Sequence, residues 1–417
     1  MNILIAPDSF KGSLSALAFC QIAEQTIQLL CPDACIEALP MADGGEGTME
    51  AFLAQTRGEK YAVQVHDPLG KLIIAQYAMI DTLHFRNAYF SNTSFSDASG
   101  KNNTIAIIEM ACASGLPLID KALQDPMKTS SFGTGELIKD ALTQGCRQFI
   151  IGLGGSATND GGMGMLQALG VIFYDKNQQP LQACGAALEA ITDIDLSHID
   201  SRCKQSEFII AADVNNPLLG ENGATFVYGK QKGVDPKNLV ILEKGMHNFV
   251  QQTQDLMSKQ GLKNAELIHL NKGAGAAGGL GFALMAYCQA NMYSGFELIA
   301  QLAQLDTLLA GEHSRPDLII SGEGCFDRQS LQGKLIGRLV QRTQHYKIPL
   351  VVICGCYRFE SDLSTISPDL EVVSLCSLAS CNDANHLEHC IKKTSVLIKE
   401  AIGQLMDDKC FFEGYNP

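Results

Sequence analysis

Short apolar runs alternate along the chain with longer segments in which apolar residues recur every three or four positions. The runs "TIAIIEMA" at 104–111 and "QFIIGLGG" at 148–155 predict strands that are buried on both faces, and "EFIIAADV" at 207–214 predicts a further strand. Segments 14–30 and 335–346 have the spacing of amphipathic helices. Because strands and helices alternate in this order, the sequence predicts an α/β protein with parallel sheets covered by helices.

Two stretches depart from this alternation. Residues 61–80 contain two alternating apolar and polar runs joined by "DPLG", which predicts a β-hairpin. Residues 83–103 are polar with interleaved aromatics and lack a clear period, so we expect an exposed insertion or hairpin there. A lid, an oligomer contact and a plain surface loop all fit this segment.

Five glycine-rich turns follow predicted strands and open predicted helices. Each carries polar residues beyond what turning requires. In open α/β sheets, ligands bind outside the carboxyl ends of strands, and helix amino termini suit phosphate. A single such turn is usually only a tight connection, but five in one chain favour a cleft that binds an anion. The turns are 6–15, 41–48, 129–136, 152–164 and 321–334.

Length, composition and charge narrow the class of protein. The chain has 417 residues, enough for two or three domains, with 46% hydrophobic and 18% charged residues, as in globular proteins. The net charge of −14 argues against nonspecific binding to nucleic acid or anionic membranes. No apolar stretch approaches the ~20 residues of a membrane span, and "MNILIAPDSF" lacks the basic region of a signal peptide. The 15 scattered cysteines are typical of buried thiols, so we expect a cytoplasmic protein.

Common nucleotide and nucleophile signatures are mostly absent. "RQSLQGKL" has Arg328 in place of the first glycine of a P-loop and Leu335 in place of its hydroxyl residue. "GAGAAG" at 273–278 fits the dinucleotide-binding fingerprint, but the segment around the downstream acid Glu297 has a helical pattern. An NAD(P)-dependent oxidoreductase that uses this loop stays as an alternative. No serine nucleophile elbow is present, since "GGSAT" has Thr158 where that motif needs glycine.

Phosphoryl transfer to an alcohol suits the residues that the glycine-rich turns carry. It needs cations on the phosphates, carboxylates that hold Mg²⁺, and often a carboxylate that accepts the alcohol proton. For any single Asp, a helix N-cap is the simpler interpretation, and Asp8 and Asp160 fit it. "DGGEGT" is harder to explain as a cap, because two acids bracket two glycines and Thr48 can cap by itself. The candidate cations are Lys11, Lys334 and Arg328, and the candidate carboxylates are Asp8, Asp43, Glu46, Asp160, Asp213, Glu323 and Asp327.

Long motifs, in the same order, resemble the bacterial glycerate kinase family. They include "APDSFKGSLSA", "PMADGGEGTMEAF", "GLGGSATNDGGMGMLQALG", "ADVNNPLLGENGAT" and "SGEGCFDRQSLQGK", and the resemblance runs from the first residue to about residue 360. It implies a kinase that uses ATP and Mg²⁺ to phosphorylate D-glycerate, usually to 2-phosphoglycerate. Its partners are then small molecules, with neither nucleic acid nor membrane among them. A monomer and a homodimer both stay open.

The resemblance also implies an architecture of two α/β domains with the active site in the cleft between them. A Rossmann-like domain would be built from both chain ends, residues 1–60 plus 295–417. A second α/β domain, residues 61–294, would be inserted between its parts. Asp43 and Glu46 would then tolerate a phosphorylated ligand because Mg²⁺ arrives with it.

Site residues follow from the resemblance by position. We expect Lys11, Asp43, Asp213 and Asp327 to be catalytic, and Asp43 and Asp213 are also the candidates for metal binding. Which carboxylate acts as base stays open. The residues expected to bind substrate or phosphate are Asp8, Ser9, Gly44, Gly45, Glu46, Ser156, Thr158, Asn159, Asp160, Asn215, Glu323 and Lys334.

The late turn departs from the family's usual pattern, which is closer to "GEGRIDSQT". Here Cys325 stands in place of an arginine, and Arg328 stands in place of a small residue. Arg328 is therefore a candidate to restore the missing cation. This altered turn is also the only support for a second alternative, a non-catalytic nucleotide-binding protein.

Overall fold

The chain folds into two compact units. The computed structural model describes residues 1–90, 104–259, 265–311, 315–359, 363, 366–378 and 390–413. The terminal unit comprises Met1–Asp43, Glu50–Gln55 and Phe296–Pro417, and the inserted unit comprises Gly44–Met49 and Thr56–Gly295. Both combine helices with sheets, which are wholly parallel in the terminal unit and mixed in the inserted unit, so the predicted α/β class is confirmed.

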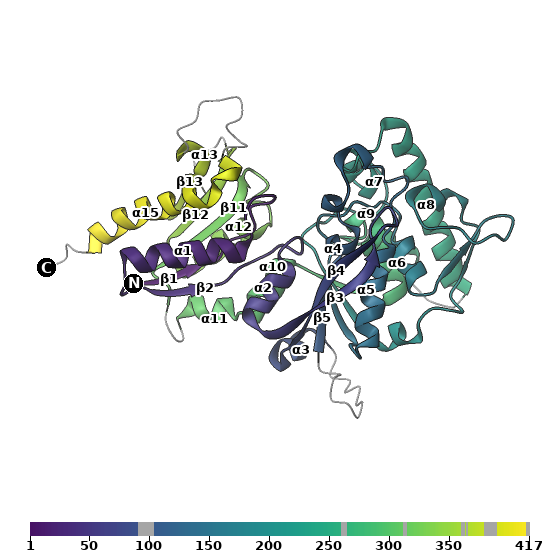
Figure 1. Ribbon diagram of the computed structural model, residues 1–417, viewed down its shortest axis with the longest axis horizontal. Helices are drawn as coiled ribbons and strands as arrows, with labels where there is room; N and C mark the ends of the chain where they lie inside the picture. The colour runs from purple at the N-terminus through teal and green to yellow at the C-terminus, as the bar shows by residue number, and fades with distance from the viewer. Residues whose placement is uncertain are drawn as a thin grey trace. The chain divides into compact units, whose positions relative to one another are not determined.

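The terminal unit is built on a five-stranded parallel sheet (Figure 1). In this sheet β1 lies between β11 and β2, and its Ile3 pairs with Leu318 on one side and with Ile36 on the other. From β1 the chain runs to β2 on one side, whereas β12 and β13 extend the sheet beyond β11 on the other. The strand order therefore reverses between β1 and β11, which makes this a topological switch point. The strands, in spatial order, are β13 (Leu370–Ser374), β12 (Leu350–Tyr357), β11 (Leu318–Phe326), β1 (Asn2–Ile5) and β2 (Cys35–Ala38).

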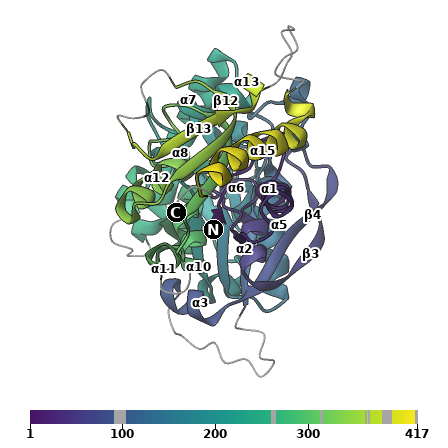
Figure 2. The ribbon, with the colours of Figure 1, turned by 90° about the vertical axis from the view of Figure 1, so that its left-hand side faces the viewer.

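The three inner strands of this sheet, β1, β11 and β12, are largely buried on both faces. Helices α1 (Ala16–Leu30) and α15 (Thr394–Glu413) lie side by side (Figure 2) and share a hydrophobic core with Ile5 and Ile320. Leu4, which points to the opposite face of β1, is also fully buried, as strands covered on both sides require. The other helices of this unit are α10 (Gly295–Leu302), α11 (Leu305–Ala310), α12 (Leu335–Tyr346) and α13 (Leu375–Leu378), together with most of α2 (Thr48–Gln55).

The inserted unit contains a six-stranded mixed sheet. Its first four strands in spatial order, β10, β9, β6 and β5, are mutually parallel. The fifth, β4, pairs with β5 in the antiparallel sense, and the edge strand β3 is antiparallel to β4. The pair of β3 and β4 is the predicted hairpin. Its turn is held by Asp67, whose Oδ1 accepts hydrogen bonds from the N–H groups of Leu69 (2.8 Å) and Lys71 (2.9 Å). The strands are β10 (Asn291–Tyr293), β9 (Glu207–Ala211), β6 (Gln148–Gly152), β5 (Thr104–Glu109), β4 (Leu72–Asp81) and β3 (Arg57–His66).

Helices and a small ribbon pack around this sheet and enclose one large hydrophobic core. The ribbon is antiparallel and consists of β7 (Ile172–Tyr174) and β8 (Asp193–Asp195). The α-helices of the inserted unit are α3 (Leu83–Tyr89), α4 (Ala111–Ser114), α5 (Phe132–Thr143), α6 (Met163–Ala168), α7 (Ala224–Tyr228), α8 (Pro236–Lys259) and α9 (Ala276–Cys288).

The first part of segment 83–103 differs from the prediction. Where we expected an exposed insertion or hairpin, the chain forms helix α3, and Phe85 and Phe90 are buried. The rings of Phe85 and Tyr89 lie one helical turn apart, with centroids 4.8 Å from each other. Such an aromatic pair stabilises a helix locally even where the longer apolar period is missing. Residues 91–103 lie outside the described segments.

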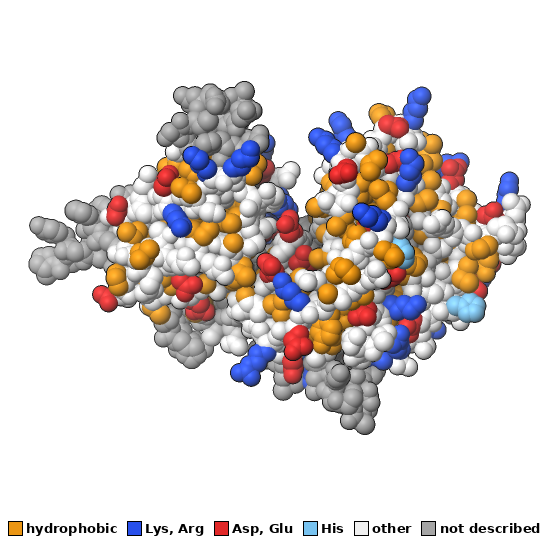
Figure 3. All heavy atoms as spheres, viewed as in Figure 1, with side chains coloured by type: hydrophobic (Ala, Val, Ile, Leu, Met, Phe, Trp, Pro, Cys, Tyr) orange, Lys and Arg blue, Asp and Glu red, His pale blue; other side chains and the backbone are white. Residues whose placement is uncertain are grey.

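The cysteines, the helices and one face of the surface can be compared with what the composition predicted. Twelve cysteines of the described segments are free thiols, whereas Cys31 at the carboxyl end of α1 is disulfide-bonded, which its spacing did not predict. None of the described helices combines the length and the apolar character that crossing a membrane requires. On the face shown in Figure 3, acidic and basic side chains are interspersed, so no continuous basic surface for nucleic acid is present there.

Candidate functional site

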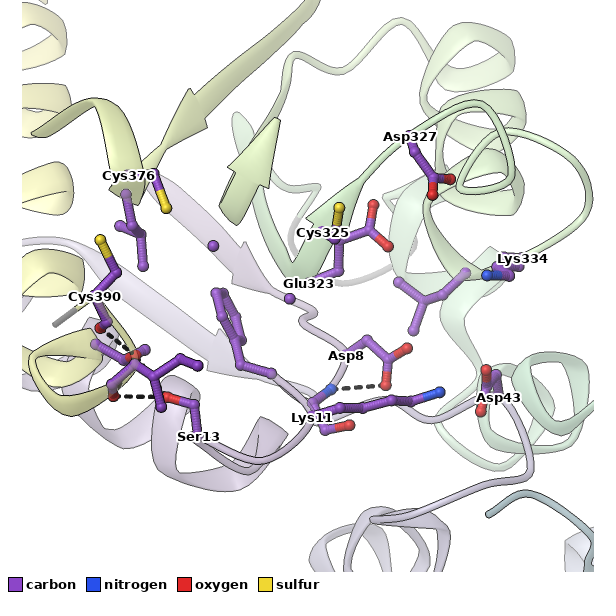
Figure 4. A pocket seen from close by; sticks show the side chains of 18 residues that line it. Asp8, Lys11, Ser13, Asp43, Glu323, Cys325, Asp327, Lys334, Cys376 and Cys390 are labelled. Atoms are coloured by element: carbon purple, nitrogen blue, oxygen red, sulfur yellow. Dashed lines mark hydrogen bonds between the residues drawn. The ribbon is translucent and has the colours of Figure 1, made fainter. Parts of the chain in front are cut away.

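A cavity of about 360 Å³ lies at the switch point of the terminal sheet, at the carboxyl ends of β1 and β11 (Figure 4). In open α/β sheets this is the place where ligands bind. Its wall is formed by the turn after β1, by the first acid of "DGGEGT", and by the end of β11 with the turn that follows. The predicted site residues that line it are Asp8, Ser9, Lys11, Asp43, Glu323, Asp327 and Lys334.

The turn after β1 presents Lys11 on an anchored backbone. The neighbouring Phe10 is buried and stacks on Phe19 of α1, with ring centroids 5.6 Å apart. Lys11 itself is exposed. In Figure 4 its side chain reaches past Asp8 toward Asp43. The sequence thus places the Lys11 ammonium at the cavity on an anchored turn.

The end of β11 and the following turn supply two acids and a second lysine. Glu323 lies within β11, and its Oε1 is buried without a hydrogen-bond partner. Asp327 Oδ1 accepts a hydrogen bond from the N–H of Gln329 at 2.7 Å, so this carboxylate also organises the turn. Lys334 is exposed at the N-cap position of α12. The unpartnered oxygen of Glu323 is available to a ligand hydroxyl or a water molecule.

Burial raises the pKa of both Asp8 and Glu323 to about 7. For Asp8, loss of solvation is the largest cause and the negative charge of Asp43 adds to it, while Lys11 lowers the pKa. For Glu323, loss of solvation is again the largest cause, and Lys334 and Lys11 lower the pKa. Carboxyl groups that titrate near neutral pH are suited to accept a proton from an alcohol.

The raised pKa of Glu323 predicts how Glu323→Gln changes stability with pH. A carboxyl group whose folded pKa exceeds its unfolded value binds more protons in the folded state, so stability falls as pH rises between the two values. For Glu323 this window runs from its ordinary value of 4.5 to about 7. We expect the melting temperature of E323Q, relative to wild type, to rise across this window and to level off above it.

The matched control for that pH series is Glu400→Gln, at an exposed position on α15. Its melting temperature should follow the wild-type curve at every pH. If E323Q also runs parallel to wild type, Glu323 is not buried in the folded protein as described.

The acids of the cavity suit a divalent cation that a ligand brings with it. Asp8, Asp43 and Glu323 all line the wall, and carboxylate oxygens are what Mg²⁺ prefers. Across the described segments, however, no group of three His, Cys, Asp or Glu side chains is arranged to hold a metal ion by itself. Mg²⁺ usually keeps few protein ligands and is shared with substrate phosphates, so the donor set fits Mg²⁺ carried by a nucleotide.

The two unusual residues of the late turn, Cys325 and Arg328, differ in their position relative to the cavity. Cys325 lines the cavity and pairs in the sheet with Cys356 of β12. Arg328 is exposed and is not among the residues that line the cavity, whereas Lys334 is. Within the described residues, Lys334 is therefore better placed than Arg328 to supply a second positive charge.

In the inserted unit, backbone packing explains the two glycines of "DGGEGT". Gly44 has a φ of +91°, and a Cβ on it would lie 2.3 Å from the carbonyl oxygen of Ala211 at the end of β9. A Cβ on Gly154 would lie 2.4 Å from Cα of Gly45, and the N–H of Gly154 donates to the carbonyl of Gly44 at 3.2 Å. Glu46 is exposed beside them. The glycines therefore let this loop seat itself against the carboxyl ends of β6 and β9.

Two further predicted residues follow β9 at the same edge of that sheet. Asp213 is half-buried two residues past its end, and Asn215 is exposed. The neighbouring Asn216 holds the loop, because its Nδ2 donates to the carbonyl of Asn222 (2.9 Å) and its Oδ1 accepts from the hydroxyl of Tyr228 (2.6 Å). The acidic glycine loop, the central glycine-rich loop and the Asp213 segment thus meet within the inserted unit.

Asp160 of the central loop is fully buried and has a structural task. Its Oδ2 accepts hydrogen bonds from the N–H (2.7 Å) and hydroxyl (2.8 Å) of Ser131 and from the N–H of Gly164 (3.1 Å). Its Oδ1 accepts from the N–H of Gly162 at 3.1 Å. Burial raises the pKa of Asp160, while these four hydrogen bonds lower it. The carboxylate ties the turn at 129–136 to the start of α6, which is the capping role that the sequence left open.

The other polar residues of the central loop are also inaccessible. Thr158 and Asn159 are fully buried, and Asn159 Nδ2 donates to Thr225 Oγ1 at 3.2 Å. Thr158 Oγ1 and Asn159 Oδ1 are buried without a hydrogen-bond partner. Ser156 keeps 9% of its surface exposed, so it is the predicted residue of this loop that is most open to a ligand.

A buried lysine that the sequence did not single out contacts this loop. Lys232 is 2% exposed, and its Nζ donates to Ser156 Oγ (2.8 Å) and to the carbonyl of Thr158 (2.7 Å). Loss of solvation lowers the pKa of Lys232 to about 7, and the charge of Asp160 raises it. Lys232 lies in "YGKQKGVD", whose charge is typical of an exposed turn. The flanking glycines are therefore the only local feature that indicates close packing around this lysine.

The "GAGAAG" loop lacks the structural context of a dinucleotide site. The segment before it is the 3₁₀ helix η7 (Ala265–Leu270), where the fingerprint needs a strand. A Cβ on Gly275 would lie 2.2 Å from the carbonyl oxygen of Pro217, and one on Gly278 would lie 2.1 Å from that of Thr158. Close packing at the start of α9 therefore accounts for these glycines.

Comparison of this chain with known proteins shows the family to which it belongs. The model of the glycerate kinase family matches residues 3–408. The glycerate kinase of Haemophilus influenzae is 39% identical over 364 residues, 87% of this chain and 88% of that protein. The glycerate 2-kinase of Escherichia coli K12 is 39% identical over 356 residues, 85% of each chain. A crystal structure from Salmonella typhimurium LT2, provisionally described as glycerate kinase 2, has a TM-score of 0.70 and 32% identity and covers 98% of this chain and 99% of its own. The chain therefore belongs to the glycerate kinase family.

Proposed function

We propose that this protein transfers the γ-phosphoryl group of ATP to D-glycerate and forms 2-phosphoglycerate and ADP. Membership of the glycerate kinase family supports a kinase that acts on an alcohol, and the name of the E. coli relative supports the 2-hydroxyl as acceptor. The observation that carries the proposal is the cavity at the switch point of the terminal sheet. It gathers two lysines and four acids at the place where open α/β sheets bind ligands.

In this proposal the two lysines bind phosphate. Lys11 and Lys334 line the same cavity. Both lower the pKa of Glu323, so their positive charges act on groups inside this cavity. Negative charge spreads over the oxygens of the transferring phosphoryl group in the transition state. An ammonium held beside those oxygens therefore stabilises the transition state more than the ground state.

The acids divide between proton transfer and metal binding. Asp8 and Glu323, whose pKa values lie near 7, are suited to take the proton of the glycerate hydroxyl as its oxygen attacks phosphorus. Asp43, and Asp213 of the inserted unit, are the acids that we propose to hold Mg²⁺. The ion, when bound, would neutralise phosphate charge. Asp327 keeps the late turn in shape beside the cavity.

From the inserted unit, we propose that Gly44, Gly45, Glu46, Ser156 and Asn215 contact the substrate. The buried Thr158, Asn159 and Asp160 would shape the loop that presents Ser156. The proposal includes a cytoplasmic enzyme that acts as a monomer or a homodimer on small molecules alone.

A coupled assay of ADP release tests the activity. Purified protein would receive ATP and Mg²⁺ with D-glycerate, L-glycerate, glycerol or lactate. We expect ADP release with D-glycerate alone, its loss on addition of EDTA, and its recovery with excess Mg²⁺. Phosphorus NMR of the product would distinguish 2-phosphoglycerate from 3-phosphoglycerate.

Other outcomes would support the alternatives. ATP binding without turnover on any acceptor would favour a non-catalytic nucleotide-binding protein. Binding of a nicotinamide cofactor on titration would favour the oxidoreductase, although the packing of "GAGAAG" speaks against it. ADP release that is equal with and without EDTA would remove Mg²⁺ from the proposal.

A further inference from the structure

Ser156 is held from two sides within the inserted unit. Its neighbours in the chain are fixed by backbone hydrogen bonds, from the N–H of Ala157 to the carbonyl of Ser114 (3.0 Å) and from the N–H of Leu116 to the carbonyl of Gly155 (2.8 Å). Its side chain is fixed separately by Lys232. A serine on a glycine-rich loop would otherwise rotate freely about its Cα–Cβ bond, so this double restraint needs an explanation.

The chemistry of the contact sets the direction of the serine hydroxyl. In this contact Lys232 Nζ donates and Ser156 Oγ is the acceptor. The carbonyl of Thr158 is the second acceptor and fixes the position of Nζ. The proton of Ser156 Oγ is not used in this bond, so it can be donated elsewhere.

Stability alone does not explain a lysine at this position. Lys232 is almost wholly buried, and placing a charge there is unfavourable compared with an apolar side chain of similar length. The loop also contains two buried polar atoms without partners, Thr158 Oγ1 and Asn159 Oδ1. The loop therefore carries more polar groups than its own folding satisfies, as binding loops do.

We propose that Lys232 is a positioning residue that holds the Ser156 hydroxyl as a hydrogen-bond donor to an anionic oxygen of the ligand. The identity of that ligand rests on the proposed function, because the carboxylate of D-glycerate and the phosphates of ATP offer the same chemistry. Lys232 does not touch the ligand. It acts by orienting Ser156 and by placing a positive charge behind its hydroxyl.

The test combines Ser156→Ala, Lys232→Met and the double variant. A lost hydrogen bond to an anionic oxygen weakens binding by about 10- to 100-fold, so S156A should raise KM for one substrate by that factor and change kcat less. K232M should raise the same KM. The double variant should be no worse than S156A, because both changes remove one interaction. Lys230→Met, at an exposed position in the same segment, is the matched control and should behave as wild type.

A titration without turnover identifies the ligand. Calorimetry with D-glycerate, inorganic phosphate and ATP, each alone, compares wild type with S156A and S156T. Weaker binding of D-glycerate alone would assign Ser156 to the carboxylate, and weaker binding of phosphate and ATP would assign it to the phosphates. S156T keeps a hydroxyl and should retain more of the affinity than S156A.

Several results would overturn the inference. Unchanged KM and unchanged binding of all three ligands by S156A would do so, even if K232M lowered the melting temperature. Additive effects of the two single changes would show that Lys232 acts elsewhere. If K232M does not fold, ligand binding by S156A and S156T still tests whether the Ser156 hydroxyl contacts the ligand. If wild type has no kinase activity, the proposed function fails, but the titrations still test Ser156, and no binding of any ligand overturns the inference as well.

Discussion

Replacement of Lys11 by alanine should lower kcat/KM for phosphoryl transfer from ATP by at least about 100-fold. Lys11 lies at the cavity wall on a turn anchored by the buried Phe10, and its charge lowers the pKa of both Asp8 and Glu323. A cation fixed in this way contributes most when negative charge develops on the transferring group. Steady-state kinetics with both substrates varied would measure the loss. A fall in kcat and in kcat/KM together would mark an interaction made mainly in the transition state.

Three further variants make the result for Lys11 specific. Lys11→Arg keeps a positive charge and should recover part of the rate, whereas Lys11→Met keeps only the chain length and should not. Lys399→Ala changes an exposed lysine on α15, outside the cavity, and should leave the rate at the wild-type level. A near-normal rate for K11A would remove Lys11 from the catalytic residues and leave Lys334 as the lysine to test.

The sequence predicted those parts of the fold that depend on local patterns. Buried strands such as β5, β6 and β9 are continuous apolar runs, and "DPLG" between two alternating runs predicts the hairpin of β3 and β4. The turns after β1 and β11 also stood out, because glycine, acids and lysine occur together there. What the pattern could not give is the neighbour relation of β1 and β11, which are more than 300 residues apart. That pairing creates the cavity, and the resemblance to a known family suggested it where the periodicity could not.

The residues that sequence reasoning missed or assigned differently depend on distant packing. Lys232 has the composition of a surface turn around it, yet it is buried against Ser156, which is 76 residues away. The glycines of "GAGAAG" fit a fingerprint, but their surroundings show that they serve close contact with Pro217 and Thr158. A local pattern reports what a segment prefers, and it does not report which distant backbone will lie against it.

Replacement of Asp160 by alanine should lower the free energy of unfolding by roughly 3 kcal/mol or more. The change leaves the N–H groups of Ser131, Gly162 and Gly164 and the hydroxyl of Ser131 without their acceptor at a site that water does not reach. Each buried donor left unsatisfied costs about 1–3 kcal/mol. Asp160→Asn can keep the three bonds made by Oδ2 and should lose less. Denaturant unfolding, with hydrogen exchange in strand β6 as a local probe, would measure the differences.

Asp175→Ala is the matched control, because Asp175 also accepts hydrogen bonds from backbone N–H groups, those of Asn177 (2.8 Å) and Gln179 (2.9 Å), but in an exposed turn. Water can replace its carboxylate there, so the change should have little effect on unfolding. Similar losses for D160A and D175A would show that turn geometry, and not burial, sets the cost. An unchanged stability of D160A would mean that the four hydrogen bonds do not hold the loop. The carboxylate of Asp160 would then be free for a ligand, and the effect of D160A on KM would decide between these roles.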